Sequence, residues 1–324
     1  MASPLWKSSL LAAAGTLSLI STAGAEGTPA PTVVSAAIAG VVAAGTTIEL
    51  IKDGFNGSEG PLALPDGSLI FTETLANRIT RIAPDGSTSA YLENSNGSNG
   101  LGFTANGDLY AVQVLNPRVG IVYPPAKAKT LADQFEGLPF GRPNDLVVNK
   151  RGGVYFTDSG VAAKPDQLAT AKPAVYHIPP GGALQRIASD IERPNGIQLS
   201  PDEKVLYVAN TLGEYVLAYD IAADGSVGTR RNFAKLSGWS KAETGYSSGA
   251  DGLAVDAAGR LYVASNVGIE VFNAKGEVVG SIALPKKPQN IAFAGPNKQT
   301  LFVVGRGAAY KIAVLTPGFA DRAK

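Results

Sequence analysis

The sequence of 324 residues has no cysteine and only one histidine, His177, and these two shortages remove whole classes of functional site. Without cysteine there can be no disulfide, iron–sulfur cluster, thiolate zinc site or cysteine nucleophile. With one histidine, a metal centre built from several imidazoles is also excluded. Any chemistry must therefore use oxygen ligands, or hydroxyl, amide and carboxylate groups.

An excess of charge is lacking as well, because 28 Lys and Arg residues balance 27 Asp and Glu residues to a net charge of +1. Such a chain has no excess of positive charge with which to bind a phosphate backbone, so we expect no nucleic-acid partner. Glycine and proline, in contrast, are plentiful, with 38 and 21 residues. This composition favours many short strands and turns over long helices.

Residues 1–25 are typical of a cleaved signal peptide. Lys7 supplies a positive charge, residues 10–20 are apolar, and Ala23-Gly24-Ala25 offers small residues for cleavage. The alternative, a membrane anchor, is disfavoured because the apolar run is short and interrupted for a span of about 30 Å. No later run is long enough to cross a membrane. We expect a linker or weakly ordered lead-in over residues 26–45, and a mature protein that is periplasmic or secreted.

Six segments of the chain share one pattern, which consists of a polar residue, a short apolar strand, a turn such as Asp-Gly or Asn-Gly, and a second apolar strand. Turn dipeptides between apolar runs indicate β-hairpins. Successive segments start 40, 45, 51, 56 and 38 residues apart, a spacing that fits one four-stranded propeller blade each. The segments begin at Glu59, Asn99, Asn144, Asn195, Asp251 and Gln289.

The repeat predicts an all-β fold in which residues 46–324 form one six-bladed β-propeller of four-stranded blades. A closed ring removes exposed sheet edges. The lone strand predicted at Thr46–Lys52 would complete the last blade beside a strand near Tyr310–Leu315. An open β-sandwich or two stacked domains fit poorly, because no change in composition marks a boundary.

The first residue of every repeat carries a side-chain oxygen, and equivalent positions on inner strands point toward one central channel. Local turn preference accounts for one or two of the Asn and Asp residues, but it does not account for Glu59. Two carboxylates and several amides suit a hard cation, and Ca²⁺ takes six to eight oxygen ligands. Without a cation, Glu59 and Asp251 would repel each other and one would be expected to protonate. We therefore predict Ca²⁺ as the cofactor, with other divalent cations as alternatives.

Four segments resemble the signature segments of the senescence marker protein/gluconolactonase family, whose relatives include regucalcin and diisopropyl fluorophosphatase. The resemblance runs from about residue 46 to residue 315 and implies a six-bladed propeller with a divalent metal, commonly calcium. The implied metal ligands are Glu59, Asn144, Asn195 and Asp251. The segments are Glu59-Gly60-Pro61, Arg142-Pro143-Asn144-Asp145, Arg193-Pro194-Asn195-Gly196 and Ala250-Asp251-Gly252.

The resemblance also implies that Arg142 binds substrate near the metal and that Asp251 is the catalytic base. An Arg fork suits recognition of carboxylates or sugar hydroxyls, although Arg142 is also explained as a surface residue before proline, since Arg193-Pro194 repeats the pattern. We predict Asn99 and Asn144 as further substrate-binding residues and leave Gln289 out of the site. His177 is expected to pack on an outer strand rather than to act as a base.

The predicted function is that of an exported, calcium-dependent lactonase for gluconolactone-type or other small lactones. The cation would polarise the lactone carbonyl while Asp251 activates the attacking water. Three alternatives remain: a phosphotriesterase-like hydrolase with the same metal cage, a non-catalytic calcium-stabilised binding module, and a strictosidine-synthase-like propeller, whose relatives lack the metal set. The expected partner is a small-molecule lactone. Nothing in the sequence fixes the oligomeric state, and a monomer is slightly favoured.

Overall fold

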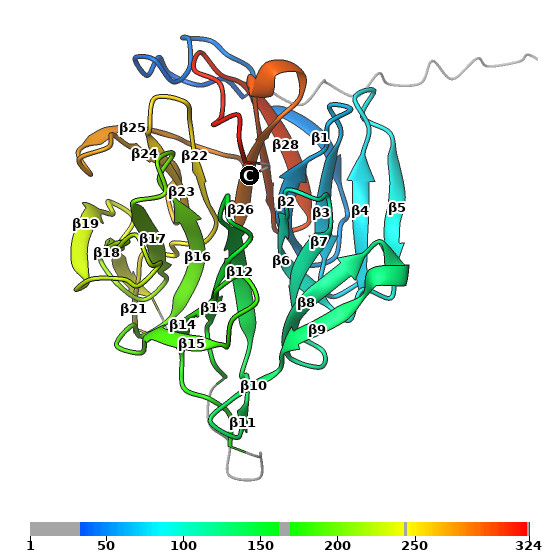
Figure 1. Ribbon diagram of the computed structural model, residues 1–324. Coiled ribbons are helices and arrows are strands. Elements are labelled where there is room, and N and C mark those ends of the chain that lie inside the picture. Colours follow the sequence, from blue (N-terminus) through cyan, green and yellow to red (C-terminus); the bar gives the residue numbers. More distant parts are fainter. Residues whose placement is uncertain (1–32, 162–168, 243–244, 323) are drawn as a thin grey trace, which may run out of the picture. The chain divides into compact units, whose positions relative to one another are not determined.

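Six antiparallel four-stranded sheets form a ring in the computed structural model of the chain, which describes residues 33–161, 169–242, 245–322 and 324 (Figure 1). This arrangement confirms the predicted six-bladed β-propeller. The predicted signal peptide, residues 1–25, lies outside the described residues and stays a prediction. In the described part of the chain the only helices are two 3₁₀ turns, η1 (Pro125–Lys127) and η2 (Pro296–Lys298). Hence no described helix has the length and apolarity that a membrane span requires.

In each blade the strands follow one another from the innermost to the outermost. The first three blades are β2 (Ser58–Ala63), β3 (Leu69–Glu73), β4 (Arg78–Ile82) and β5 (Thr88–Glu93); β6 (Ser98–Phe103), β7 (Leu109–Gln113), β8 (Arg118–Tyr123) and β9 (Lys129–Ala132); and β12 (Pro143–Val148), β13 (Val154–Asp158), β14 (Ala174–Ile178) and β15 (Gln185–Ala188). The last three are β16 (Pro194–Leu199), β17 (Val205–Asn210), β18 (Tyr215–Asp220) and β19 (Arg231–Lys235); β22 (Leu253–Val255), β23 (Leu261–Ser265), β24 (Gly268–Phe272) and β25 (Val278–Ile282); and β26 (Asn290–Ala294), β27 (Thr300–Gly305), β28 (Ala308–Ala313) and β1 (Glu49–Asp53). Two small hairpins lie outside the blades, β10 (Gln134–Phe135) with β11 (Leu138–Pro139) and β20 (Ser240–Ala242) with β21 (Gly245–Ser247).

The ring is closed by β1, which is the outermost strand of the sixth blade. It pairs antiparallel with β28, and Glu49 lies opposite Lys311. The Lys311 ammonium forms an ion pair of 2.9 Å with the Glu49 carboxylate. The predicted closure of the last blade by an N-terminal strand is therefore confirmed, and the strand begins at Glu49 rather than at Thr46.

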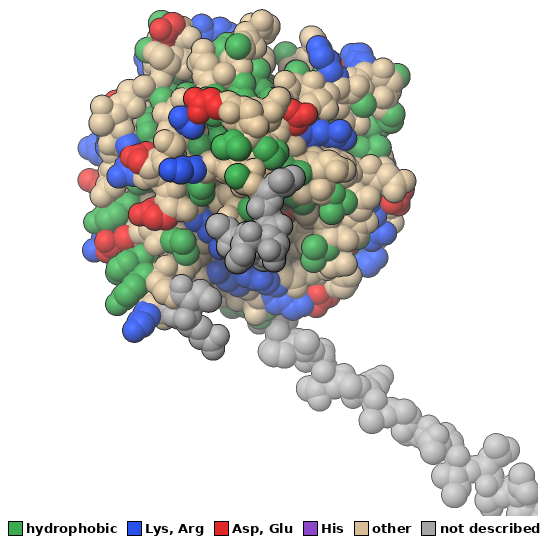
Figure 2. Space-filling view, turned by 90° about the horizontal axis from the view of Figure 1, so that it is seen from below, with side chains coloured by type: hydrophobic (Ala, Val, Ile, Leu, Met, Phe, Trp, Pro, Cys, Tyr) green, Lys and Arg blue, Asp and Glu red, His purple; other side chains and the backbone are tan. Residues whose placement is uncertain are grey.

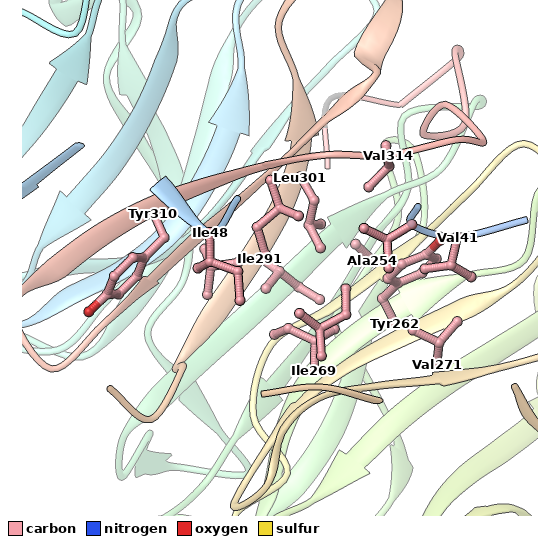
Figure 3. Packing of buried hydrophobic residues seen from close by; sticks show 14 of the residues in the cluster. Val41, Ile48, Ala254, Tyr262, Ile269, Val271, Ile291, Leu301, Tyr310 and Val314 are labelled. Atoms are coloured by element: carbon pink, nitrogen blue, oxygen red, sulfur yellow. The ribbon is translucent and has the colours of Figure 1, made fainter. Parts of the chain in front are cut away.

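Residues 33–45, which fall in the predicted linker, pack against the fifth and sixth blades. Ile38, Val41 and Val42 are buried in one apolar cluster with side chains of β23 and β26, as Figure 3 shows around Val41. The Leu315 amide also donates a hydrogen bond of 2.9 Å to the Val41 carbonyl. Ile38, Val41 and Val42 supply the buried contacts of this Ala- and Val-rich segment, so the described part of the lead-in belongs to the folded unit.

The hairpin turns follow the Asp-Gly signal in the sequence. In the first turn, the Asp66 carboxylate accepts the Ser68 amide at 2.9 Å, while Gly67 takes a φ of +82°. The same contact of 2.9 Å recurs between Asp85 and Ser87. Asp side chains bond the backbone two residues on, and glycine adopts positive φ without steric cost. These local preferences explain why the strands pair where the repeat predicts.

At the start of the inner strands, the pairing register shifts over the polar residue that opens the repeat. In the first blade the shift lies between Glu59 and Leu62, and in the fourth it lies between Pro194 and Ile197. The second and third blades have the same irregularity. Such bulges re-aim a side chain next to a functional site. Here they coincide with the polar residues predicted to face the channel.

Neighbouring inner strands approach closely because glycine follows the polar residue. A Cβ atom on Gly196 would lie 2.1 Å from the Asp251 carbonyl oxygen, and one on Gly60 would lie 2.1 Å from the Asn99 carbonyl oxygen. The second strand of a blade also holds the next inner strand, because the Thr157 hydroxyl donates to the Asn195 carbonyl at 2.6 Å. Backbone contacts between blades therefore fix the spacing of the site residues.

The substitution Gly196→Ala tests this spacing. We expect it to lower the free energy of unfolding by about 2 kcal/mol, because the added methyl group meets backbone that cannot move without shifting Asp251. Urea unfolding followed by circular dichroism measures the change. Gly228→Ala is the control, since its nearest atom is the Asp220 carbonyl oxygen at 3.6 Å. Equal stabilities of the two variants would contradict the close approach.

Candidate active site

A cavity of about 530 Å³ opens at the end of the propeller where the inner strands begin, the end that Figure 2 shows. The residues that line it include all six predicted site residues, so the ring brings together side chains spread over almost 200 positions of the sequence. They are Glu59, Asn99, Arg142, Asn144, Asn195 and Asp251.

Glu59 lies deep in this cavity with only 8% of its surface exposed. Its carboxylate accepts hydrogen bonds from the Gln289 amide at 3.2 Å and the Asn290 amide at 3.1 Å. Burial raises the pKa of Glu59 to about 7, and the negative charge of Asp145 adds to this effect against the Asn290 hydrogen bond. Gln289, which the sequence analysis leaves out of the site, thus contacts a predicted ligand directly.

Asp251 precedes β22 and is the second carboxylate in the cavity. Burial raises the pKa of Asp251 well above its ordinary value, and the charges of Glu59 and Asp145 raise it further. Its Oδ1 atom is buried and has no hydrogen-bond donor among the described residues. A buried carboxylate without donors is costly unless a cation or a proton neutralises it.

Two amide oxygens in the cavity lack donors in the same way. The Oδ1 atoms of Asn99 and Asn195 are buried and accept no hydrogen bond from the described residues. The Asn195 side chain is held by its other end, because its Nδ2 donates to the Thr211 hydroxyl at 3.0 Å, which itself donates to the Ala250 carbonyl at 2.8 Å. Buried polar atoms nearly always have a partner, so these two oxygens are available to a ligand, either a cation or a hydrogen-bond donor.

The donor set therefore fits a hard divalent cation. Glu59 and Asp251 would supply two negative charges, and amide oxygens would supply neutral ligands, which is the set that Ca²⁺ accepts. Among the described residues no group of three or more His, Cys, Asp and Glu side chains could hold a metal. Any metal site in this cavity thus depends on Asn side chains as well as on the two carboxylates.

A buried ion pair lies behind these two carboxylates. Asp145 is fully buried, and its carboxylate accepts a hydrogen bond from the ammonium group of Lys324, whose side chain is 3% exposed. In Figure 1 the chain end marked C lies near the middle of the ring. Asp145 and Asn290 follow the polar residue of their repeats, where the other four blades have glycine. Sequence reasoning missed both residues, although this break in the glycine pattern marks them.

Arg142 lines the cavity, and a buried carboxylate fixes its backbone. Asp158 accepts the amides of Gly141 and Arg142 at 2.7 Å and the amide of Gly160 at 2.8 Å. Burial raises the pKa of Asp158, while these three amides oppose the rise. In the next blade, the Arg193 amide donates to the Asn210 side chain at 3.2 Å, and Arg193 also lines the cavity.

His177 and three aromatic residues lie away from the cavity. His177 is buried on the third strand of its blade and stacks on Tyr155 with ring centroids 4.1 Å apart, which agrees with the predicted packing role. Trp239 and Tyr246, at the β20–β21 hairpin, stack on each other at 4.6 Å. None of these four side chains lines the cavity.

The ring of six blades, with a polar cavity of carboxylates, amides and Arg at one end, defines a six-bladed β-propeller with a candidate small-molecule site. The sequence profile of the SMP-30/gluconolactonase/LRE-like region matches residues 57–306. The chain belongs to this family. The resemblance seen in the sequence is thereby confirmed.

Individual relatives agree with this assignment. The gluconolactonase of Zymomonas mobilis is 29% identical over 298 residues, which cover 84% of this chain and 83% of that protein. The lactonohydrolase oryL of Aspergillus oryzae is 26% identical and covers 68% of this chain and 53% of its own length. A solved gluconolactonase of Xanthomonas campestris has a TM-score of 0.73 and 27% identity, covering 88% of this chain and 94% of that one. These relatives support a lactone-hydrolysing function.

Without a bound cation, Asp251 should destabilise the protein at alkaline pH. Its pKa is higher in the folded than in the unfolded chain, so the folded state binds more protons and stability falls as pH rises above about 4 toward the raised pKa. We expect Asp251→Asn to raise the Tm of chelator-treated protein by about 5 °C at pH 8 and by less at pH 5.

Calorimetry at both pH values measures this difference. Asp220→Asn is the control, because the Asp220 side chain is exposed and pairs with Arg231 on the outer strands. A lower Tm for Asp251→Asn at both pH values would show that the Asp251 charge is already compensated.

The Lys324–Asp145 pair generates a separate prediction. Removing one partner of a buried pair leaves an uncompensated charge, so Lys324→Met should lower the free energy of unfolding by roughly 3 kcal/mol. The double variant with Asp145→Asn should recover much of this loss. Denaturant unfolding measures both. Lys150→Met is a matched control, because Lys150 pairs with Asp321 at the surface and should change stability by less than about 1 kcal/mol. A loss of the same size in the control would contradict the buried pair.

Proposed function

We propose that this protein is a calcium-dependent lactonase that hydrolyses sugar lactones of the gluconolactone type or other small lactones. The proposal depends on one observation. Two buried carboxylates with raised pKa values and two amide oxygens that accept no hydrogen bond from the described residues line one cavity. Glu59, Asn144, Asn195 and Asp251 would hold the cation. A divalent cation held there supplies Lewis-acid polarisation of the lactone carbonyl.

Asp251 acts as the general base in this proposal. Its Oδ1 atom accepts no hydrogen bond from the described residues, so this oxygen can accept the proton of a water molecule in the cavity. Water adds to the carbonyl carbon, its proton passes to Asp251, and the ring carbon–oxygen bond breaks. Asp251 returns that proton to the leaving alkoxide, so lactone and water together give one hydroxy acid and the carboxylate is regenerated.

The remaining side chains bind and orient the lactone. The Asp158 carboxylate fixes the backbone of Arg142. The planar guanidinium of Arg142 can therefore donate paired hydrogen bonds to polar groups of the substrate. Asn99 lines the same cavity with a free amide oxygen that can accept from a sugar hydroxyl. Positioning of this kind brings the reacting carbonyl to the base and excludes bulk water.

We propose further that the protein is exported, on the basis of the signal-peptide pattern in residues 1–25. A cell compartment that supplies free Ca²⁺ at millimolar concentration would keep a weak oxygen cage loaded. Fractionation of expressing cells, with mass determination of the mature N-terminus, tests this part independently of activity.

The decisive activity test is hydrolysis of glucono-1,5-lactone and a few aliphatic lactones, followed by pH-stat titration. Chelator-treated protein should lose its turnover, and added Ca²⁺ should restore it together with a higher Tm. Asp251→Asn should lower kcat at least a thousandfold, because it removes the base and one cation ligand. Arg142→Gln should mainly raise KM.

Arg231→Gln is the control, because Arg231 lies on β19 at the outer edge of its blade. Its activity should equal that of the unmodified protein. Stabilisation by Ca²⁺ without turnover of any lactone would refute the lactonase and leave the phosphotriesterase-like hydrolase and the binding module, which a panel of phosphotriesters separates.

A further inference from the structure

Positive charge gathers at the mouth of the cavity. Four cationic side chains line it, against only two carboxylates, Glu59 and Asp251. None of the four forms an ion pair with a carboxylate among the described residues. This group, called the basic rim below, consists of Arg142, Arg193, Lys287 and Arg306.

The basic rim surrounds the cavity from several blades. Arg142 and Arg193 precede the inner strands of the third and fourth blades, Arg306 lies in the turn between β27 and β28, and Lys287 precedes β26. Figure 2, which looks onto this end, shows Lys and Arg side chains gathered near its centre. A ligand in the cavity would therefore face positive charge from opposite sides.

The three arginines of the rim are held through their backbone, and their guanidinium groups donate no hydrogen bond to the described residues, whereas the Lys287 ammonium donates a hydrogen bond to the Asn266 side chain. The Arg306 amide donates to the Gln289 side chain at 2.9 Å, and Gln289 in turn donates to Glu59 at 3.2 Å. Arg142 and Arg193 are held by Asp158 and Asn210 in the same manner, through their backbone amides. The rim is thus built onto the residues proposed to hold the cation.

The charges do not cancel within the site. Asp145 and Lys324 neutralise each other, and the proposed divalent cation would neutralise Glu59 and Asp251, which leaves the four charges of the rim. A neutral sugar lactone presents hydroxyl groups, and amides and carboxylates are sufficient to form hydrogen bonds with them. Four cations around one cavity repel one another unless an anion lies among them, and Arg forks match carboxylate, sulfonate and phosphate groups.

We infer that the substrate is a lactone that carries an anionic group, a carboxylate, sulfonate or phosphate, at the end remote from the reacting carbonyl. This inference rests on the proposed lactonase function. In this arrangement the residues proposed to hold the cation would bind the carbonyl end of the lactone. Arg193 and Arg306 would bind its anionic group at the mouth of the cavity. The cavity volume of about 530 Å³ lies within the range of small-molecule sites.

Matched pairs of lactones test the inference. Glucono-1,5-lactone is compared with 6-phosphoglucono-1,5-lactone, and glucono-1,4-lactone with glucaro-1,4-lactone, which differ in an anionic group on the same ring size. We expect kcat/KM to be at least tenfold higher for the anionic member of each pair. The advantage should shrink between 0.05 and 0.5 M NaCl, since salt screens attraction between exposed charges. The pair that shows the larger advantage distinguishes phosphate from carboxylate.

Variants assign the effect to the rim. Arg193→Gln and Arg306→Gln should each lower kcat/KM about tenfold for the anionic lactones and less than twofold for the neutral ones. Arg231→Gln, which removes a charge far from the cavity, should change neither. Equal or faster hydrolysis of the neutral lactones, or an equal loss for both classes in the rim variants, would overturn the inference.

Binding measurements separate this inference from the lactonase proposal. Calorimetric titration compares 6-phosphogluconate with gluconate on calcium-loaded protein and on Arg193→Gln. Turnover of neutral lactones with no rim effect would overturn the inference and keep the lactonase. Selective binding of 6-phosphogluconate, lost in Arg193→Gln and without turnover of any lactone, would refute the lactonase and with it the lactone substrate, and would leave the basic rim as an anion-binding site only. If 6-phosphogluconate binds no better than gluconate and anionic lactones are not preferred, the inference is wrong.

Discussion

The mutual repulsion of two buried carboxylates is the constraint on which the site depends. Glu59 and Asp251 face one cavity, and burial raises the pKa of both. Around them, the structure arranges donors and charges that reduce the cost. Gln289 and Asn290 donate to Glu59, and the ion pair of Lys324 with Asp145 keeps a third carboxylate from adding an uncompensated negative charge. What remains uncompensated is what a divalent cation would satisfy.

The propeller holds this unfavourable arrangement because rigid backbone contacts place it. Bulges at the inner strands of the first four blades coincide with polar side chains that line the cavity. In four blades, glycine after the polar residue lets the next blade approach to backbone distance. Apolar side chains between neighbouring blades supply the stability that offsets buried charge, as in the cluster around Val41 and Tyr262 (Figure 3). Strain at functional sites persists only where the surrounding structure over-determines it.

The repeated pattern made it possible to predict the fold and the polar residues, one from each repeat, that line the cavity. Local turn preferences at Asp66-Gly67 and apolar runs between turns specify the blades, and the polar residue that opens each repeat faces the channel as expected. The packing of residues 33–45 could not be foreseen in the same way, because small apolar residues such as Val41 and Val42 are also common in linkers. Their burial depends on a surface that only the closed ring provides.

The sequence also could not predict which charged residues from distant parts of the chain lie close together. Arg306 and Lys287 belong to no motif, and the backbone of Arg306 is held by the side chain of Gln289, which directly precedes β26. Lys324 reaches Asp145 across 179 positions of the chain. Arg193 stands in an Arg-Pro-Asn segment of the sequence, but the segment by itself assigns no role in the site to its side chain. Contacts of this kind follow from topology rather than from spacing in the sequence.

Closure of the ring by β1 and β28 has a consequence for how the chain folds. The two strands are about 260 residues apart, so bringing them together costs a loop-closure entropy of about 5 kcal/mol. Blades one to five consist of contacts that are local in sequence, whereas the sixth can form only after both of its parts are present. During synthesis, the growing chain therefore exposes unpaired strand edges until its last blade is complete, and this interval is the one in which intermolecular strand pairing competes with folding.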